Sequence, residues 1–548
     1  MKLYIKKIAL AFFATGIALV ASSQTMDDAI RFSENNYEGT ARTVAMGNAF
    51  TALGGDLGAV DINPAGSAVA NYSQFSITPA LTIGINTAQG TLDRYDNFPY
   101  FQNKMRNSRA KFDIPNIGFT FNWKTKRTRG VKNFSFSFLS NTTNTFSDNL
   151  YAKGVNSTTS YLGSIAELAS HDGMTGTLLE QDNKWDVAPW LYAAAYPNLI
   201  TTYNGWDDGF VGATEQFDSQ GNKFLSGDIN QVFERKVSGS KSSYLLNFGM
   251  DISDIVYLGV NLGINSISYT STEVFREEAV NHLLFNIADD VNPVYFKNAT
   301  IQNYYRASGA GFYSKIGIIV NPFKGLRLGA AIQTPTLNSI TEKYTLDTYA
   351  SYTDGNFEAK SPLGEYKYTF REPLRANFGV AYTFGNRGLV SLDYEVQAYK
   401  NMKFNPGDLD SFNDFSQQNS DIREFLKSGQ NLRLGGEFKP ISALALRAGY
   451  GLISPAEKGS KAWTNNASLG LGYSSKGSFF ADLAVRGTFY NAEYIMPYED
   501  YVFQVDKNTG DYLTDDNGFL LINPDYFAPK IKSVKQLWKI FLTIGFRF

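Results

Sequence analysis

The chain has 548 residues, and its 50 lysines and arginines nearly balance its 52 aspartates and glutamates, for a net charge of −2. This balance gives no overall attraction to nucleic acid, and a chain without cysteine cannot be a disulfide-stapled secreted domain. The 48 glycines, 33 tyrosines and 42 phenylalanines are typical of extensive β-structure.

The N-terminus has the layout of a secretory signal peptide over residues 1–23. Lys2, Lys6 and Lys7 precede an apolar run at 8–20, and small residues follow at 21–23, where a signal peptidase requires them. The run is too short to cross a membrane comfortably as a helix, and no later segment offers the ~18 consecutive apolar residues of a spanning helix. We therefore expect export and cleavage before Gln24.

Residues 24–71 form a glycine-rich stretch ahead of the first expected strand. The stretch begins with a helix-like piece, MDDAIRFSENN, and ends in GGDLGAVDINPAGSA. Gly54 and Gly55 allow the backbone to approach a neighbouring wall, and the turn 63–66 redirects the chain. The length suits a plug inside a β-barrel, here called the hatch segment, although a tail in the periplasm is the alternative.

Alternation of apolar and polar residues dominates the rest of the chain. In KGLRLGAAIQ, Leu326, Leu328 and Ile332 lie on one face, whereas Arg327 and Gln333 lie on the other. The same alternation predicts fourteen strands, at 72–86, 112–124, 131–143, 241–252, 254–272, 302–320, 324–353, 364–383, 387–402, 430–440, 443–454, 461–475, 477–494 and 534–548.

The predicted connections alternate between tight turns and long loops, the longest loop being 144–240. Together with an even strand number, this alternation is typical of a bacterial outer-membrane barrel. The last strand ends on Phe548, with Phe546, Ile544 and Leu542 on the same face. Such an ending resembles the signal recognised by the barrel-assembly machinery, although a last strand of a soluble sandwich would look similar. The sequence therefore predicts an all-β fold, a 14-stranded antiparallel transmembrane β-barrel at 72–548 with the hatch segment in its lumen.

The run ARTVAMGNAFTALGGDLGAVDINPAGSAVA resembles the N-terminal hatch of FadL-type outer-membrane transporters. Gly47 lies in the expected neighbourhood of that motif. The residues that carry the resemblance, and the hatch or gating role it implies, are Gly54, Gly55, Asp56, Asn63, Pro64, Ala65 and Gly66. The close match of sequence motifs covers about thirty residues. The chain is longer than usual for the family, and the extra length lies mainly in 144–240.

Membership of that family implies passive transport of hydrophobic compounds, such as long-chain fatty acids or aromatic hydrocarbons, across the outer membrane of a Gram-negative bacterium. It implies no cofactor. The resemblance implies that a hydrophobic external site captures the ligand and that a lumen site beside the hatch binds it. Movement of the hatch, together with a kinked strand, then lets the ligand leave sideways into the membrane. The expected partners are outer-membrane lipid and the small hydrophobic ligand, with no nucleic acid and with the chain as a monomer.

The long loop contains two apolar pieces with helical spacing, which we expect to form the external capture groove. Packing of the loop onto the barrel rim is the alternative. The capture residues are Leu162, Ile165, Leu168, Trp185, Trp190, Leu191, Tyr192, Tyr196 and Leu199.

Pro115 interrupts the strand pattern FDIPNIGFTFNW, and proline cannot donate to a sheet ladder. A gap between strands is therefore expected there, with Asn116 and Gly118 beside it, as the lateral exit. The alternative is that the strand simply begins at Ile117.

Charged residues at inward positions of the strands are expected to pair with one another and with the hatch segment, or to bind a ligand carboxylate. They are Arg327, Arg433, Glu437, Arg447, Asp482 and Arg486.

Signals for catalysis or metal binding are sparse. The two histidines, His171 and His282, are far apart, and no G-x-S-x-G or Walker sequence occurs. The stretch 506–519 resembles a calcium loop only loosely, because it lacks the bidentate Glu. We therefore expect no enzyme, no catalytic residues and no metal site. The rival functions are a general porin for small polar solutes and a structural or adhesive barrel.

Overall fold

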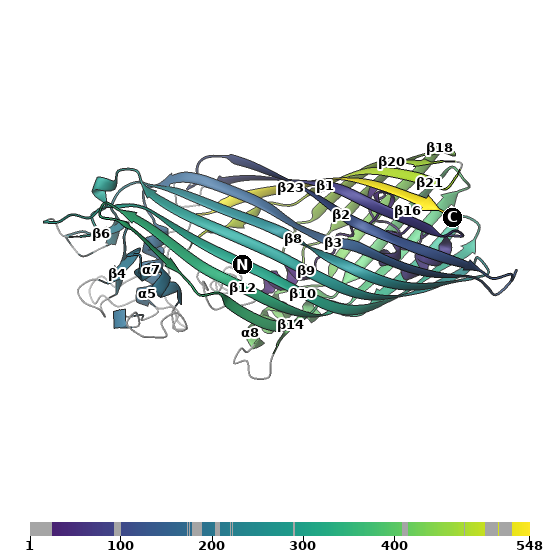
Figure 1. The fold of residues 1–548 in the computed structure, drawn as a ribbon, viewed down its shortest axis with the longest axis horizontal. Coiled ribbons are helices and arrows are strands. Elements are labelled where there is room, and N and C mark those ends of the chain that lie inside the picture. Colours follow the sequence, from purple (N-terminus) through teal and green to yellow (C-terminus); the bar gives the residue numbers. More distant parts are fainter. Residues whose placement is uncertain are drawn as a thin grey trace.

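The strands close into an antiparallel β-barrel (Figure 1). The computed structural model describes residues 25–548 except 92–99, 172–173, 175, 178–188, 203–208, 220, 222, 289–290, 408–414, 476, 499–512 and 514–528. Closure comes from β1 and β23, which pair from Gln74↔Arg547 to Gly90↔Ile531. Within the described residues, 14 strand positions make up the wall, as the alternation predicts. The wall strands are β1 (Gln74–Gly90), β2 (Met105–Lys124), β3 (Val131–Asn156), β8 (Ile229–Ile252), β9 (Val256–Ala279), β10 (Phe296–Phe323), β11 (Leu326–Gln333) with β12 (Leu337–Tyr352), β14 (Gly364–Arg371) with β15 (Arg375–Phe384), β16 (Gly388–Gln397) with β17 (Lys403–Pro406), β18 (Gly429–Ile441), β19 (Leu444–Ile453), β20 (Thr464–Ser474), β21 (Phe479–Phe489) and β23 (Ile531–Arg547).

Three neighbouring wall positions are each built from two strands rather than one, so the continuous strands predicted at 324–353, 364–383 and 387–402 are wrong in this respect. Pro335 and Pro373 lie in the first two breaks, and neither can donate to a ladder. The third break contains the 3-10 turn η4 (Tyr399–Asn401).

The outer and inner faces of the wall differ in polarity. Phe248 and Ile316 are exposed on the outside, whereas the adjacent Asn247 and Lys315 are buried inside. Apolar side chains outside and polar ones inside are the arrangement of a barrel surrounded by lipid. No helix among the described residues is long and apolar enough to cross a membrane.

Tight turns lie at the end of the barrel that also holds the C-terminus, and the long loops lie at the other end (Figure 1). Toward the long loops the strands run farther than predicted. β3 continues to Asn156 and β8 begins at Ile229, so the large loop spans 157–228 rather than 144–240. The extensions carry polar residues such as Glu234 and Lys236, which is why an apolar alternation does not mark them.

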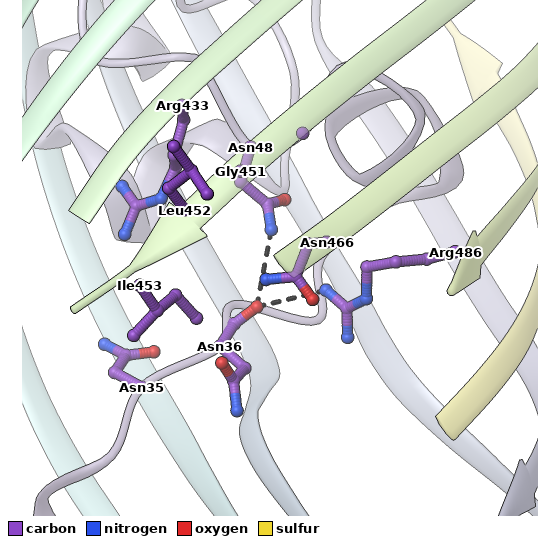
Figure 2. Close-up of a pocket in the computed structure, with 10 residues that line it drawn as sticks. Asn35, Asn36, Asn48, Arg433, Gly451, Leu452, Ile453, Asn466 and Arg486 are labelled. Carbon is purple, nitrogen blue, oxygen red and sulfur yellow. Dashed lines mark hydrogen bonds between the residues drawn. The ribbon is translucent and has the colours of Figure 1, made fainter. Parts of the chain in front are cut away.

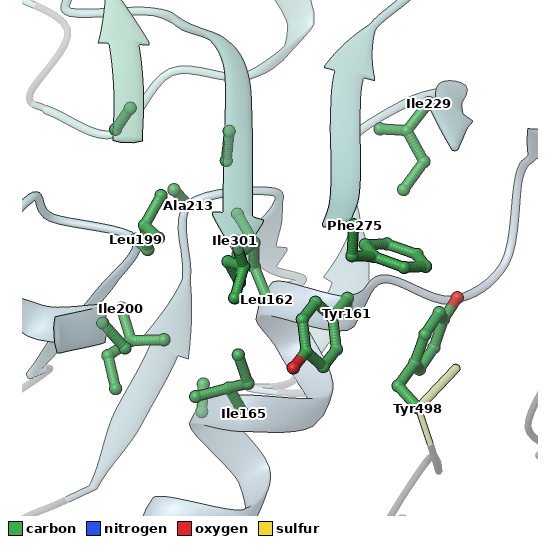
Figure 3. Packing of buried hydrophobic residues seen from close by; sticks show 14 of the residues in the cluster. Tyr161, Leu162, Ile165, Leu199, Ile200, Ala213, Ile229, Phe275, Ile301 and Tyr498 are labelled. Atoms are coloured by element: carbon green, nitrogen blue, oxygen red, sulfur yellow. The ribbon is translucent and has the colours of Figure 1, made fainter. Parts of the chain in front are cut away.

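The large loop folds into a small cap over the mouth of the barrel. Its helix α5 buries Tyr161 and Leu162 against Phe275 of β9 and Ile301 of β10, with Tyr498 alongside (Figure 3). The cap core is thus continuous with the inner wall. The cap elements are α5 (Tyr161–His171), α7 (Pro189–Ala195), the paired β4 (Ile200–Thr202) and β5 (Phe210–Gly212), and the paired β6 (Glu215–Phe217) and β7 (Lys223–Leu225). Other loops contain η3 (His282–Leu284), β13 (Asn356–Lys360), α8 (Ser416–Phe425) and β22 (Glu493–Ile495).

The hatch segment, purple in Figure 1, lies inside the barrel. Its first helix starts with a capping box in which Thr25 and Asp28 satisfy each other's backbone N–H groups. Phe32 and Phe50 are fully buried within the lumen. The elements of the segment are α2 (Met26–Ser33), α3 (Ala41–Ala45), α4 (Ala59–Ile62) and η1 (Pro64–Val69).

Candidate functional site

The predicted hatch motif holds the segment together and attaches it to the wall. The Asn63 amide donates to the carbonyls of Thr51 (2.6 Å) and Ile318 of β10 (3.1 Å), while its oxygen accepts from the Ala65 N–H at the start of η1. The Pro64 carbonyl accepts from Asn247 of β8 (3.0 Å). Because these bonds join the motif to two wall strands, the turn is fixed in place.

Within the segment, the glycines and Asp56 of the motif shape the backbone. Gly54 and Gly55 have φ of +62° and +72°, which side chains rarely adopt. A Cβ on Gly54 would also collide with Gly66. Asp56 accepts from the Thr40 hydroxyl (2.5 Å) and from the Gly58 N–H (2.9 Å), which ties the two halves of the segment together.

Glycines on the inner wall, which the sequence analysis overlooked, make room for the hatch backbone. A Cβ on Gly317 would overlap the Asn63 side chain, and one on Gly449 would overlap the backbone at Gly47. The signal was available, because a glycine at an inward position of a strand often marks close backbone approach. The wall glycines that meet the hatch segment are Gly249, Gly259, Gly317, Gly329, Gly379, Gly435, Gly449 and Gly470.

The predicted lumen charges all have protein partners. Glu437 lies between Arg42 of the hatch segment (3.0 Å) and Arg447 (2.7 Å), and Arg447 also binds Asp482 (2.5 Å). Arg327 donates to a hatch carbonyl, that of Leu53 (2.7 Å).

The remaining two predicted charges belong to ion clusters whose other members were not foreseen. Arg433 pairs with Glu395 and lies over the ring of Tyr37. Arg486 donates to the carbonyls of Asn36 and Tyr37 and to the carboxylate of Glu38 (3.3 Å). The unforeseen members are Glu38, Lys241, Glu372, Arg375, Glu395 and Lys539.

The ladder between β2 and β3 stops partway up the wall. The two strands pair from Lys124↔Asn133 to Asn116↔Asn141 and no farther, although both strands are described throughout their lengths. Beyond that point β2 still pairs with β1, and β3 still pairs with β8. An isolated bridge, Asn103↔Lys153, rejoins the two sides nearer the mouth. The backbone ladder is therefore interrupted between residues 105–115 and residues 142–152, and this interruption is here called the lateral gap. At the same level Asn86 of β1 donates to Asp148 of β3 (2.8 Å).

The residues predicted for the lateral exit lie at the lower edge of this gap. Asn116 forms the last pair, Pro115 follows it directly, and Gly118 lies within the paired part. The alternative in which the strand begins at Ile117 is wrong, because β2 runs through Pro115 from Met105.

The hatch segment binds the edge of β3 that β2 leaves unpaired. The N–H of Asn36 donates to the Thr143 carbonyl (2.6 Å), and the N–H of Glu38 donates to the Thr142 carbonyl (2.8 Å). The side chain of Asn144 bonds to Asn36 (3.0 Å) and to Glu34 (3.3 Å). Residues 34–38, here called the gate strip, thus bond to β3 at residues 142–144, the lower end of the gap.

A cavity of about 190 Å³ lies on the other side of the gate strip. Ile30, Glu34, Tyr399, Ile453, Pro455 and Tyr490 are among its lining residues. Figure 2 shows a smaller adjoining pocket, where the Asn36 carbonyl accepts from Arg486 (3.1 Å) and from Asn48 (3.4 Å). The gate strip therefore stands between this cavity and the lateral gap.

Four of the nine predicted capture residues are buried in the core of the cap. Leu162, Ile165, Leu191 and Leu199 belong to its core. Trp190, Leu168 and Tyr192 are half-buried, and Tyr196 is 57% exposed with its ring 5.4 Å from that of Tyr192. Trp185 lies outside the described residues.

Among the described residues, no group of three or more His, Asp or Glu side chains is arranged to hold a metal ion. His282 belongs to η3 and His171 ends α5, so they lie in separate loops. The loosely calcium-like stretch 506–519, apart from Leu513, lies outside the described residues.

Solved structures with a similar course of the chain include a Pseudomonas aeruginosa FadL homologue (TM-score 0.48, 11% identity, covering 92% of this chain and 98% of that one). The P. putida toluene transporter TodX (0.44, 13%, 93% and 99%) and the monoaromatic hydrocarbon channel CymD (0.42, 10%, 93% and 98%) are also similar. No family model and no curated protein matches the sequence. At such low identities and TM-scores, the likeness is limited to the general course of the chain.

Proposed function

We propose that the protein carries small hydrophobic compounds passively across the outer membrane of a Gram-negative bacterium, with the hatch segment as its gate. The observation that carries the proposal is the pairing of the gate strip with the edge of β3 beside the lateral gap. A backbone edge facing lipid without partners would be costly, so the strip satisfies β3 while the gap is closed. Release of the strip connects the lumen cavity to the membrane.

The proposed route has three stages. Tyr192, Tyr196 and Trp190, which keep exposed surface on the cap, collect the ligand from outside. The cavity beside α2 holds it, and the gap between β2 and β3 releases it sideways after the gate strip moves. The residue motif of the hatch segment, which resembles that of FadL-type transporters, supports the same order of events.

The surroundings of the barrel follow from its surface. We propose that lipid contacts the exposed apolar ring of the wall, that Phe548 serves assembly into the membrane, and that the chain acts as a monomer and is not an enzyme. The polar-solute porin is disfavoured because the hatch segment occupies the lumen and the cap covers its mouth.

A reversible disulfide tests the gate. The chain has no native cysteine, and Glu38 and Thr142 form an antiparallel bridge, so their Cα atoms lie at about 4.5–5.5 Å, within disulfide range. In the Glu38→Cys, Thr142→Cys variant, oxidation should abolish uptake of radiolabelled toluene and oleate into cells, and a reductant should restore it.

The matched control is Thr120→Cys with Ser137→Cys, a directly paired position of β2 and β3 below the gap that does not involve the gate strip. Its oxidation should leave uptake unchanged. Equal uptake by the oxidised and reduced forms of the 38–142 variant would refute a gate at this position.

A further inference from the structure

Five basic side chains lie on the outer face of four consecutive wall strands, β10, β12, β14 and β17 (Figure 1). Their direction follows from the alternation along each strand, because Glu342, Tyr368 and Phe404, the residues next to three of them, are buried on the lumen side. The five residues, here called the basic patch, are Arg306, Lys343, Lys367, Arg371 and Lys403.

Two pairs of like charge within the patch are direct cross-strand neighbours. Arg306 of β10 lies opposite Lys343 of β12, and Arg371 of β14 lies opposite Lys403 of β17. Side chains at directly opposite positions have Cβ atoms only about 5 Å apart, and like charges there destabilise the sheet. An anion bound between the members of each pair would remove this repulsion.

The protein itself supplies little negative charge to the patch. The Glu365 carboxylate binds the Lys343 ammonium (3.0 Å) and lies 3.7 Å from that of Lys367. In the part of the chain that the structure describes, no carboxylate lies within ion-pair distance of Arg306, Arg371 or Lys403. Three cations thus remain uncompensated, although the chain as a whole has a net charge of −2.

The basic patch begins where the apolar outer ring of the wall ends. Phe312 pairs with Leu337, Leu337 with Arg371, and Arg371 with Lys403, so one row across four strands changes from exposed apolar to basic side chains. Toward the tight turns the outward residues of β10 are apolar, as at Ile316. The patch therefore lies at the level of the lipid headgroups, on the side of the long loops.

Phosphate is the anion that suits this position. Guanidinium and ammonium groups are the usual partners of phosphate oxygens, and basic residues beside a membrane-embedded surface attract anionic lipid headgroups. The acyl chains of such a lipid would lie against Phe312, Ile316 and Leu337 while its headgroup reaches the cations. A free anion would use only the polar half of this surface.

We propose that the basic patch binds the phosphate groups of a lipid in the leaflet at the long-loop end of the barrel. The site lies on the outside of the wall, whereas the hatch segment lies inside it and the lateral gap lies between β2 and β3. The bound lipid is a partner of the wall and not a transported compound. The inference therefore goes beyond the proposed function and does not depend on it.

The test measures lipid binding to the mature full-length barrel in a nonionic detergent by native mass spectrometry. The probes are lipid A with two phosphate groups and the same lipid with both phosphates removed. The barrel should bind the phosphorylated form about tenfold more tightly or better, and the double variant Arg371→Gln, Lys403→Gln should lose about tenfold or more of that affinity. The second double variant, Arg306→Gln, Lys343→Gln, should show a similar loss.

The matched control is Lys324→Gln with Arg387→Gln, which removes two exposed cations from tight turns at the other end of the barrel. It should bind the phosphorylated lipid as the parent does. Without lipid, the Arg371→Gln, Lys403→Gln variant should melt at or above the temperature of the parent, because one like-charge pair is gone.

Equal affinity for the two forms of the lipid would overturn the proposal. So would unchanged affinity in both double variants of the patch, or an equal loss in the control. Inorganic phosphate at millimolar concentration should leave the lipid bound, and displacement by phosphate alone would assign the patch to a free anion instead of a lipid. None of these outcomes bears on the gate, because the 38–142 disulfide is tested by uptake.

Discussion

The carboxylate of Glu38 accepts a hydrogen bond of 2.5 Å from the ammonium of Lys539, although the two residues are 501 positions apart in the chain. Arg486 and the Thr145 hydroxyl bind the same carboxylate. One residue of the gate strip is therefore held by side chains from β3, β21 and β23, in addition to its backbone bond to Thr142.

Glu38→Gln should loosen the gate, because Lys539 and Arg486 would remain buried without their anion. Removal of one member of a buried ion pair costs about 3–5 kcal/mol. We expect a lower unfolding temperature and a higher rate of toluene uptake. The double variant Glu38→Gln, Lys539→Met should recover part of the stability, since it removes the unpaired ammonium. If the double variant is no more stable than Glu38→Gln, the pair is not the source of the loss.

Deletion of residues 25–70 should convert a silent barrel into a conducting one, because the hatch segment fills the lumen at the level of the wall glycines. Single-channel recording in a planar bilayer measures the difference. Large, steady conductance from the intact protein would instead support the porin for polar solutes.

Gly317→Ala should displace the hatch segment, because the added Cβ would overlap the side chain of Asn63. Overpacking of this kind typically costs about 1–3 kcal/mol. Limited proteolysis should then cleave the hatch segment faster than in the parent protein. Gly436→Ala is the control, since its nearest neighbour would be the Leu389 carbonyl oxygen at 3.8 Å. Equal cleavage rates in the two variants would contradict the close approach at Gly317.

The stability of the cap should fall as the pH rises. Burial raises the pKa of Glu215 from 4.5 to about 7, and its carboxylate packs against Gly163 of α5. Between these two values the folded cap binds more protons than the unfolded one, so folding is favoured at pH 4.5 and loses free energy up to pH 7.

Hydrogen-exchange protection of the α5 amides measures this effect at pH 5 and pH 7.5. Protection should drop with pH in the parent protein and stay level in Glu215→Gln. Glu358→Gln changes an exposed carboxyl and should behave like the parent. A parent protein whose protection is independent of pH would contradict the raised pKa.

The sequence predicts the barrel well because a membrane wall imposes a simple rule on every strand. Residues along a wall strand face lipid and lumen alternately. The side that each residue faces can therefore be read from the local sequence, as for Leu328 and Arg327. The rule fails beyond the apolar ring, where both faces are polar, and this explains the early end predicted for β3. The breaks at Pro335 and Pro373 could have been predicted, because proline cannot donate a hydrogen bond to a sheet ladder.

The site is less predictable because it depends on which distant strands meet. Arg486 and Glu38 can each be assigned to an inward face or to the hatch segment, but their pairing follows from the register of the closed barrel. The lateral gap could be anticipated at Pro115, whereas the gate strip at its lower end has no local marker. The helical spacing of the apolar residues in the large loop, such as Leu191, predicts a capture groove but does not indicate that several of them pack into the core of the cap.

The distribution of the wall glycines also constrains how the molecule is assembled. The hatch segment rests on strands from β8 to β20, and the N–H of Ala41 bonds to the Thr543 hydroxyl of β23 (2.7 Å). The contacts of the hatch segment with the wall are complete only when the last strand has paired with the first. The residues at the start of the chain must therefore wait for its end before they reach their final contacts, so closure of the ring and placement of the hatch segment are late, coupled events.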